Sequence, residues 1–263
     1  MIHYKSDYEI ELIRKSSLLV GKTLAEVARH IKPGIKTIEL DRIAETFISD
    51  NGAKPAFKGY RGFPGTLCIS INEVVVHGIP GDRELKDGDL VSVDCGTIIN
   101  EYYGDSAYSF AVGDVSDDVL LLMKRTKESL YKGIESAKVA KRVGDIGFEV
   151  QSYVEGFGYS VVRDLVGHGL GKNLHEKPDV PNYGKRGTGN LLAEGLVICI
   201  EPMINLGKKS IVQEKDGWTI RTADRMPSAH FEHAIAIRKD GPDILSSFEE
   251  IEQVINNNIQ IIK

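Results

Sequence analysis

The sequence predicts an α+β protein whose two halves repeat one order, helices followed by antiparallel strands. Residues 6–31 and 37–51 carry apolar side chains at helical spacing, and Val- and Ile-rich extended segments follow them. The second half repeats this order, and its segment AEGLVICIEP resembles DGDLVSVDCG of the first half. We therefore expect a single domain of two pseudo-symmetric halves, about residues 1–115 and 116–263, with helices covering a pseudo-twofold antiparallel sheet.

The first half begins with two predicted helices. Lys32-Pro33-Gly34 ends the first helix, because proline and glycine disfavour its continuation. Thr37 is the expected N-cap of the second helix, and Gly52 is expected to end it in the left-handed conformation. Three extended segments follow, each bounded by turn residues: TLCISINEVVVHG, DLVSVDCGTII and YSFAVG.

The second half also begins with two helices. Ser116 opens a long one, and Asp145 opens another that ends near residues 156–158. The strands LVICIEPMI and HFEHAIAIR follow. No linker rich in Pro, Ser or Gly separates the halves, and a repeat longer than about 100 residues is not that of a solenoid.

Composition excludes several classes of protein. A net charge of -5, with 27% charged residues of both signs, provides no basic surface for direct binding of nucleic acid or anionic lipid. The chain shows no secretory leader and no apolar run long enough for a membrane span, so we expect a cytoplasmic protein without membrane contact. Cys68, Cys95 and Cys199 lack CxxC spacing and are expected to be buried, reduced thiols.

Two aspartates stand equally far from a predicted turn. In VSVDCGTIINEYYGDSAYSF, a hairpin that turns at Ile99-Asn100 places Asp94 opposite Asp105. Opposed Cβ atoms lie about 4.5–5.5 Å apart, where two bare carboxylates repel each other. Cations about 3.5–4 Å apart resolve the conflict, since such a carboxylate pair can bridge them. The alternative is two solvated aspartates, because Asp is common near turns.

Three more polar residues lie where a strand pattern requires apolar side chains. Glu201 ends the apolar run LVICI, and burial of an unpartnered carboxylate there costs several kcal/mol. Glu232 lies on the strand face of two alanines, whose small side chains leave space for an ion or ligand. His168 stands in the glycine-rich loop VGHGLG, which fits an active site but also an ordinary glycine turn.

Together these residues form a set of hard or borderline metal ligands. The absence of a thiolate argues against structural zinc. Oxygen-rich ligation with one nitrogen suits Mn(II), Fe(II), Co(II) or catalytic Zn(II), and ligand type does not choose among them. Two such ions suit hydrolysis, because they can generate hydroxide near neutral pH. The set is Asp94, Asp105, His168, Glu201 and Glu232.

The sequence resembles the type I methionine aminopeptidases through NEVVVHGIP, VSVDCGTIINEYYGDSAYSF, VGHGLGKNLHEKP, VICIEPMI and HFEHAIAI. These motifs occur in one order and span nearly the whole chain. The resemblance implies the pita-bread fold and two divalent metal ions per chain. It also implies removal of the first methionine from nascent polypeptides, near the ribosome, with a preference for a small second residue. We expect the chain to be a monomer.

By the same resemblance, Asp94 chelates one ion and Asp105 and Glu232 bridge both. His168 and Glu201 complete the shell of the other ion. A metal-bridging hydroxide then attacks the first peptide bond.

The resemblance also implies three catalytic roles. Glu201 shuttles the proton, His175 binds the carbonyl or tetrahedral oxyanion, and His77 holds the scissile amide. Without the resemblance, His77 is equally consistent with a hydrogen-bonded histidine at a strand end.

A pocket for the methionine side chain is implied around soft and aromatic groups, which suit a thioether. The chain departs from the family at Phe57 and Leu174, which bears on the shape of this pocket. The remaining histidines have no matching role and are expected at the surface or in supporting positions. The pocket residues are Tyr60, Phe63, Cys68 and Trp218, and the other histidines are His3, His30, His230 and His233.

Two alternatives remain at this point. A Xaa-Pro-specific peptidase of the same fold uses a similar ligand set, but such enzymes usually carry an additional N-terminal domain. A non-catalytic binding protein on the same scaffold would have lost ligands, whereas all five positions are filled here.

Overall fold

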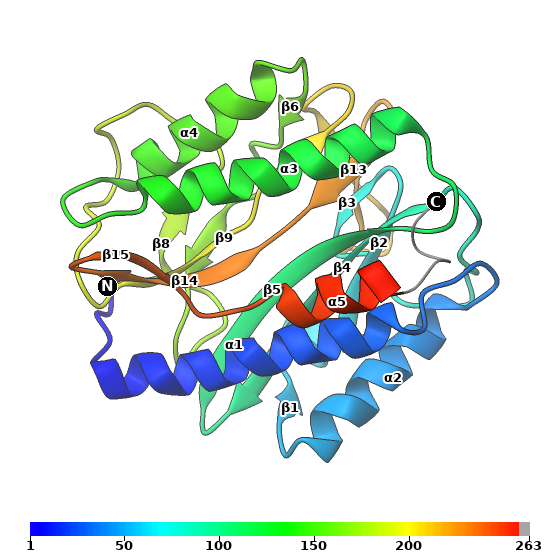
Figure 1. Ribbon diagram of the computed structural model, residues 1–263, viewed down its shortest axis with the longest axis horizontal. Helices are drawn as coiled ribbons and strands as arrows, with labels where there is room; N and C mark the ends of the chain where they lie inside the picture. Colours follow the sequence, from blue (N-terminus) through cyan, green and yellow to red (C-terminus); the bar gives the residue numbers. More distant parts are fainter. Residues whose placement is uncertain (258–263) are drawn as a thin grey trace.

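The computed structural model describes residues 1–257 as an arrangement of α-helices around antiparallel strands, which is the predicted α+β class. Helices α3 and α4 run along the top of Figure 1 and α1, α2 and α5 along the bottom, with the long strands β5 and β14 between them. No helix in this part of the chain is long and apolar enough to cross a membrane. The helices are α1 (Asp7–Ala28), α2 (Thr37–Asp50), α3 (Asp117–Ser136), α4 (Val143–Glu155) and α5 (Glu249–Asn257), with a short 3-10 helix at Tyr60–Gly62.

The first two helices lie where the sequence places them. Ser6 caps α1, and its hydroxyl and the Glu9 carboxylate bind each other's backbone amides, forming a capping box. The prediction for Thr37 is wrong, because Lys36 is the N-cap and Thr37 is already helical. The Thr37 hydroxyl instead exchanges hydrogen bonds with the backbone of Gly81. Gly52 follows α2 with a φ of 72°, as expected.

The first half contributes five strands. The first predicted segment is interrupted near Asn72, whose φ is 55°. The strand ending in YSFAVG is longer than predicted and begins at Tyr102. The strands are β1 (Lys54–Pro55), β2 (Leu67–Ile71), β3 (Val74–Val76), β4 (Leu90–Ile99) and β5 (Tyr102–Ala111).

The β4–β5 hairpin corrects the predicted register. Asp94 pairs with Ala107 and Asp105 with Gly96, so the two aspartates are diagonal neighbours and not directly opposed. The turn is centred on Asn100 and Glu101, both with positive φ, one residue later than predicted. A two-residue shift in pairing keeps each side chain on its original face, so both aspartates still face the same side.

The second half begins with α3, whose N-cap is Ser116 as predicted. Asp145 does not open α4, which begins at Val143, but its carboxylate accepts the Arg142 amide at 2.7 Å. Both predicted strands of this half are divided in two. The strands are β6 (Ser160–Val161), β7 (Gly167–Gly169), β8 (Glu176–Val180), β9 (Val197–Ile200), β10 (Met203–Asn205), β11 (Ile211–Gln213), β12 (Ile220–Thr222), β13 (Ser228–His230), β14 (His233–Arg238) and β15 (Gly241–Ile244).

The strands form four antiparallel sheets, and the elements of the two halves are mixed. The largest has the order β15-β14-β9-β7-β8, and another contains β1, β4 and β2 with β5 paired to β4. Strand β3 of the first half pairs with β12 of the second, and α5 packs on α1 at the other end of the chain. These contacts support one domain, although the boundary between pseudo-symmetric halves stays a prediction.

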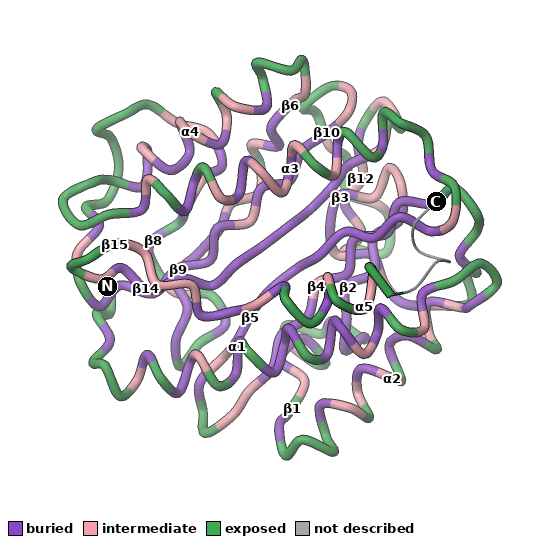
Figure 2. The backbone as a smooth tube through the Cα atoms, in the orientation of Figure 1, coloured by how far each residue is buried: buried purple, intermediate pink, exposed green. Residues whose placement is uncertain are grey.

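Burial is greatest along the central strands, where the tube is purple in β4, β5, β9 and β14 (Figure 2). Alternate residues of β9 and β14 face two different apolar clusters. Ile198 and Ile235 pack on the helix side, whereas Ala234 packs toward Leu170 and Leu174. The three cysteines are buried and free, with no disulfide among the described residues, as expected.

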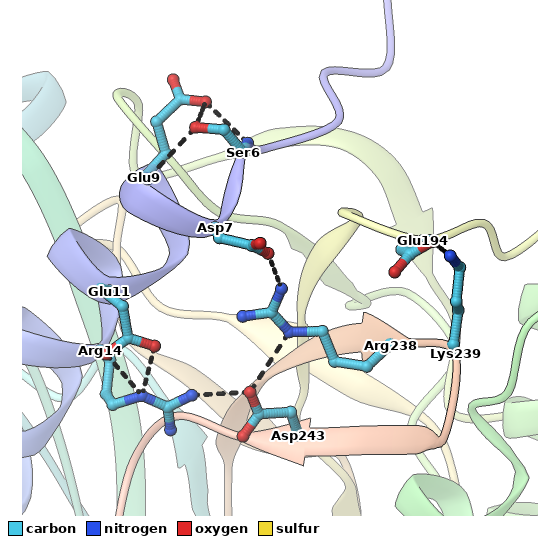
Figure 3. Close-up of polar contacts among 9 residues, drawn as sticks. All are labelled: Ser6, Asp7, Glu9, Glu11, Arg14, Glu194, Arg238, Lys239 and Asp243. Carbon is cyan, nitrogen blue, oxygen red and sulfur yellow. Dashed lines mark hydrogen bonds and ion pairs between the residues drawn. The ribbon is translucent and has the colours of Figure 1, made fainter.

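The start of α1 is tied to the β14–β15 hairpin by ion pairs (Figure 3). Arg238 pairs with Asp7, and Arg14 lies 2.6 Å from Asp243. Glu11 also binds Arg14 at 3.1 Å. The first turns of α1 are thereby fixed against strands from the far end of the chain.

Candidate metal centre and substrate cavity

A cavity of about 220 Å³ opens beside the middle of β4 and β5 and the end of β9. Every residue for which the sequence predicted a role in the site lines this cavity. They are Asp94, Asp105, His168, Glu201, Glu232, His77, His175, Tyr60, Phe63, Cys68 and Trp218, and Phe57 and Leu174 join them.

The first half supplies two carboxylates from one sheet face. Asp94 projects from β4 and is half-buried, and Asp105 projects from β5 and is buried. The negative charge of Asp94 is one of the causes that raise the pKa of Asp105. Diagonal neighbours on one face are within reach of each other's side chains, so the corrected register still brings the two together.

The second half supplies two carboxylates and an imidazole. Glu201 directly follows β9, and Glu232 lies between β13 and β14. The Glu232 backbone is fixed to β5, because its amide donates to Ala107 at 3.0 Å and its carbonyl accepts the Ser106 hydroxyl at 2.6 Å. His168 lies within the short strand β7, and not in a loop as predicted.

These five side chains converge. His168 Nε2 lies 3.7 Å from Asp105 Oδ2 and 3.6 Å from Glu201 Oε1. One ligand atom each of Asp105, His168 and Glu232 lies within 4.8 Å of the others. Ligand atoms from both halves of the chain therefore surround one small space.

Electrostatics favour the binding of a cation within this cluster. Burial raises the pKa of Asp94 to about 7. Burial, and then the negative charges of Glu232 and Asp94, raise the pKa of Asp105 well above its usual value. Burial together with the neighbouring carboxylates raises the pKa of Glu201 and Glu232 in the same way. Positive charge placed among these groups restores their ionised forms.

The imidazole of His168 is prepared for ligation. Its Nδ1 lies 2.9 Å from the carbonyl oxygen of Gly169, which can only accept, so Nδ1 carries the proton. Nε2 is left with a free lone pair on the side of the carboxylates. A hydrogen bond of this kind fixes the tautomer and ring orientation of metal-binding histidines. Burial also lowers the pKa of His168, which keeps the ring neutral.

The donor set fits divalent metal ions. Asp94 Oδ1, Asp105 Oδ1 and Glu232 Oε1 are buried without a hydrogen-bond partner among residues 1–257. Buried polar atoms normally have partners, so three unsatisfied oxygens at one place indicate missing ligation. Oxygen donors with one imidazole suit the borderline divalent ions Mn(II), Fe(II), Co(II) and Zn(II).

The sequence interpretation missed a thiol beside the ligands. Cys199 Sγ lies within 4.8 Å of the ligand atoms of Asp105, His168 and Glu232. Burial raises the pKa of this thiol well above its usual value, so it remains protonated. Its alternation with Glu201, which directly follows β9, could have placed it near the site, and in the structure it pairs with Ala234 of β14.

Two histidines face the cavity from outside the ligand cluster. The ring centroid of His175 lies 4.3 Å from that of His168, and its Nδ1 lies 2.9 Å from the Tyr60 hydroxyl. Burial lowers the pKa of His175 to about 3. His77 follows β3 with a φ of 59° and lies across from Trp218, at 6.3 Å between ring centroids.

The aromatic wall of the cavity is made by Phe63 and Trp218, which pack edge to face at 5.2 Å.

His230 also lines the cavity, which the sequence did not predict. Its Nε2 is buried with no partner within the described chain. His233 is buried elsewhere, bound to the Ser246 hydroxyl at 2.6 Å, and His3 is exposed.

Comparison with known proteins agrees with this geometry. The profile of metallopeptidase family M24 matches residues 11–239. A methionine aminopeptidase of Clostridium perfringens is 51% identical, over 94% of this chain and 99% of the relative. The crystal structure of methionine aminopeptidase from Rickettsia prowazekii superposes with a TM-score of 0.93 at 42% identity, over 94% of this chain and all of that one. The prolidase from Pyrococcus horikoshii is more distant, with a TM-score of 0.77 and 26% identity, and only 63% of its length is covered.

Proposed function

Because this chain belongs to metallopeptidase family M24, we propose that its five converging ligands hold two divalent metal ions that serve the removal of an N-terminal methionine. The chain is a methionine aminopeptidase with the pita-bread fold. The proposal goes further in assigning the ligands and the number of ions. Its main support is that four carboxylates and one imidazole from both halves line a single cavity.

The Xaa-Pro-specific alternative is not favoured. The prolidase of known structure is less similar in sequence, and more than a third of its length has no counterpart in this chain. The non-catalytic alternative is disfavoured by the ligand cluster, because a binding protein has no need of four mutually repelling carboxylates around one cavity. We retain N-terminal methionine as the substrate and a small second residue as the preference.

The ligand roles are those that the family resemblance implies. Asp94 would serve one ion, Asp105 and Glu232 would serve both, and His168 and Glu201 would complete the shell of the other. When bound, such ions acidify a water molecule and polarise the peptide carbonyl next to them.

Three residues of the chain then act on the substrate. Glu201 accepts the proton of the attacking water and passes it to the departing amine, the role of a general base followed by a general acid. Neutral His175 donates an N–H to the carbonyl oxygen as negative charge develops there. His77 holds the scissile amide from the opposite wall. The methionine side chain enters between Tyr60 and the Phe63–Trp218 pair.

The enzyme is further proposed to act in the cytoplasm, on nascent polypeptides near the ribosome, as a monomer. Three free buried thiols in the described residues agree with a reducing compartment. Size-exclusion chromatography with light scattering tests the oligomeric state.

The test uses metal-depleted protein reconstituted with Mn(II), Fe(II), Co(II) or Zn(II). We expect about two ions per chain by elemental analysis and release of methionine from Met-Ala-Ser. Glu201→Gln should lower kcat by about 100- to 10,000-fold without unfolding the protein, whereas His3→Ala should not change it. Release of the first residue from Ala-Pro but not from Met-Ala-Ser contradicts the proposal.

A further inference from the structure

The N-terminal segment, residues 2–5, lies against the loop that carries His175. Ile2 forms a β-bridge with Lys177, and Tyr4 forms one with Leu196. The Lys5 amide donates to the carbonyl of Gly195 at 2.7 Å. The segment therefore reaches both the end of the His175 loop and the start of β9.

Lys5 carries a buried charge into this contact. Its ammonium group lies 2.6 Å from Glu176 Oε2, and both side chains are at least nine-tenths buried. It also donates to the His3 carbonyl at 3.0 Å. Burial raises the pKa of Glu176, but the hydrogen bond and charge of Lys5, with the Asn173 amide, outweigh it and hold this pKa below its usual value. The positive charge of Lys5 thus compensates the cost of burying the Glu176 carboxylate.

Glu176 in turn closes the loop that precedes it. Its Oε1 accepts the Asn173 amide at 3.2 Å, and the Gly171 amide donates to the Asn173 carbonyl at 3.3 Å. A Cβ at Gly171 would lie 2.6 Å from Glu176 Oε1 and 2.8 Å from Lys5 Cε, so side chains fill the space completely. His175 is the residue immediately before Glu176 and belongs to this closed loop.

The other end of Lys5 is equally fixed. The next residue, Ser6, caps α1, and Asp7 pairs with Arg238 on β14 (Figure 3). Because Lys5 is fixed to the start of α1, its ammonium group holds the Glu176 carboxylate in a defined position relative to that helix. Supporting side chains that are themselves held in place keep a catalytic group close to the position that the reaction requires.

We propose that Lys5 is a positioning residue for His175. Its ion pair with Glu176 holds the loop of residues 171–176 so that the His175 ring stays against His168 and the Tyr60 hydroxyl. Lys5 is not among the residues that line the cavity. The inference rests on the proposed function, in which His175 donates to the substrate carbonyl.

Lys5→Met tests this, because it keeps the length of the side chain and removes the charge. We expect kcat for Met-Ala-Ser to fall by roughly 10- to 100-fold, since a misplacement of about 1 Å has effects of this size. KM should change by less than about threefold, because His175 acts mainly in the transition state. Lys5→Arg restores a positive charge and should recover part of the lost kcat.

Lys177→Met is the matched control. Lys177 lies in the same strand as Glu176, but its ion pair with Asp179 at 2.7 Å is exposed. This variant should keep the wild-type kcat. Metal content should stay that of wild type in all variants, because neither lysine reaches the ligand cluster.

The outcomes separate the two proposals. An inactive wild-type enzyme contradicts the proposed function, whereas an active wild type with an equally active Lys5→Met variant overturns only the role of Lys5. A lower melting temperature with unchanged kcat at 20 °C, well below unfolding, also overturns it. If Lys5→Met does not fold, Lys5→Met combined with Glu176→Met removes both charges. A folded double variant should still have reduced kcat, because nothing holds the Asn173 amide, and wild-type kcat there refutes the inference.

Discussion

The Tyr60 hydroxyl lies 2.9 Å from Nδ1 of His175. Burial lowers the pKa of His175 to about 3, so the ring is neutral at physiological pH and has one donor and one acceptor nitrogen. When the hydroxyl donates to Nδ1, the proton of the ring resides on Nε2. Tyr60 thereby selects the tautomer that can donate to a substrate carbonyl.

Tyr60→Phe should lower kcat by about 5- to 10-fold, which corresponds to the loss of one hydrogen bond of about 1 kcal/mol. The readout is steady-state hydrolysis of Met-Ala-Ser, with Tyr4→Phe, an exposed tyrosine, as the control. In a His175→Ala background the same change should have almost no effect, because the group that Tyr60 orients is gone. Additive effects of the two substitutions would contradict this relationship.

The metal-free enzyme should become less stable as Asp94 ionises. Its pKa is about 7 in the folded protein and about 3.8 when exposed, so between these values the folded state binds more protons than the unfolded state. The free energy of unfolding attributable to Asp94 therefore falls as pH rises from about 4 to about 7. Divalent ions bind the ionised carboxylate in place of its proton. The increase in unfolding free energy that they cause should therefore grow as pH rises from about 4 to about 7.

The contribution of Asp94 to the free energy of unfolding is isolated by subtracting the value for a variant that lacks this carboxyl group. Buried histidines such as His175, with a lowered pKa, act in the opposite direction below pH 6.5, so the wild-type profile alone mixes the two. Urea denaturation in EDTA is therefore compared for wild type and Asp94→Asn between pH 5 and 8. The difference in unfolding free energy, wild type minus variant, should fall with pH by an amount on the order of a few kcal/mol. A difference that rises with pH contradicts the assignment.

The hairpin shows how far the sequence determines the site. Alternation along the strands correctly places Asp94 and Asp105 on one face, because side-chain direction depends only on parity. The directly opposed pairing was wrong, since the exact turn depends on Asn100 and Glu101 adopting positive φ. Asn often adopts such angles but Glu rarely does, so residue type alone does not identify Glu101 as a turn residue.

Other parts of the site depend on contacts that no local pattern encodes. Glu201 and Glu232 were found because carboxylates interrupt apolar strands. Cys199 and His230 were missed because each looks like an ordinary strand residue until its strand is placed beside the ligand cluster and the cavity. Lys5 is separated from Glu176 by 171 positions, and nothing in a charged N-terminus distinguishes a buried lysine from an exposed one.

The contact between α1 and β5 should be intolerant of added volume. A Cβ at Gly104 would lie 2.3 Å from the Ser17 amide nitrogen and 2.4 Å from the Ser16 carbonyl carbon, both backbone atoms. The same helix turn is held to the hairpin by the Ser16 hydroxyl, which donates to the Tyr102 carbonyl at 2.8 Å. The helix therefore cannot withdraw without losing hydrogen bonds.

Gly104→Ala should lower the free energy of unfolding by about 1–3 kcal/mol, as overpacking typically does. Gly81→Ala is the control, because no atom lies within 4 Å of its Cβ position and its φ is not in the left-handed region. Chemical denaturation of both variants in the presence of metal measures the difference. Equal stability of the two variants would show that the helix can shift at little cost.

Trp218 should determine selectivity for methionine. Its half-buried ring packs against Phe63 and faces His77, so it forms one wall of the cavity. Removing an apolar wall costs about 1–3 kcal/mol of binding for a side chain that fills the pocket, and little for one that does not reach it. Trp218→Ala should therefore lower kcat/KM for Met-Ala-Ser about 10-fold or more, and much less for Ala-Ala-Ser. Val212→Ala, an exposed substitution on β11 of the same region, should leave the ratio between these substrates unchanged. An equal loss on both peptides would mean that Trp218 supports the fold of the β11–β12 hairpin and does not recognise the methionine side chain.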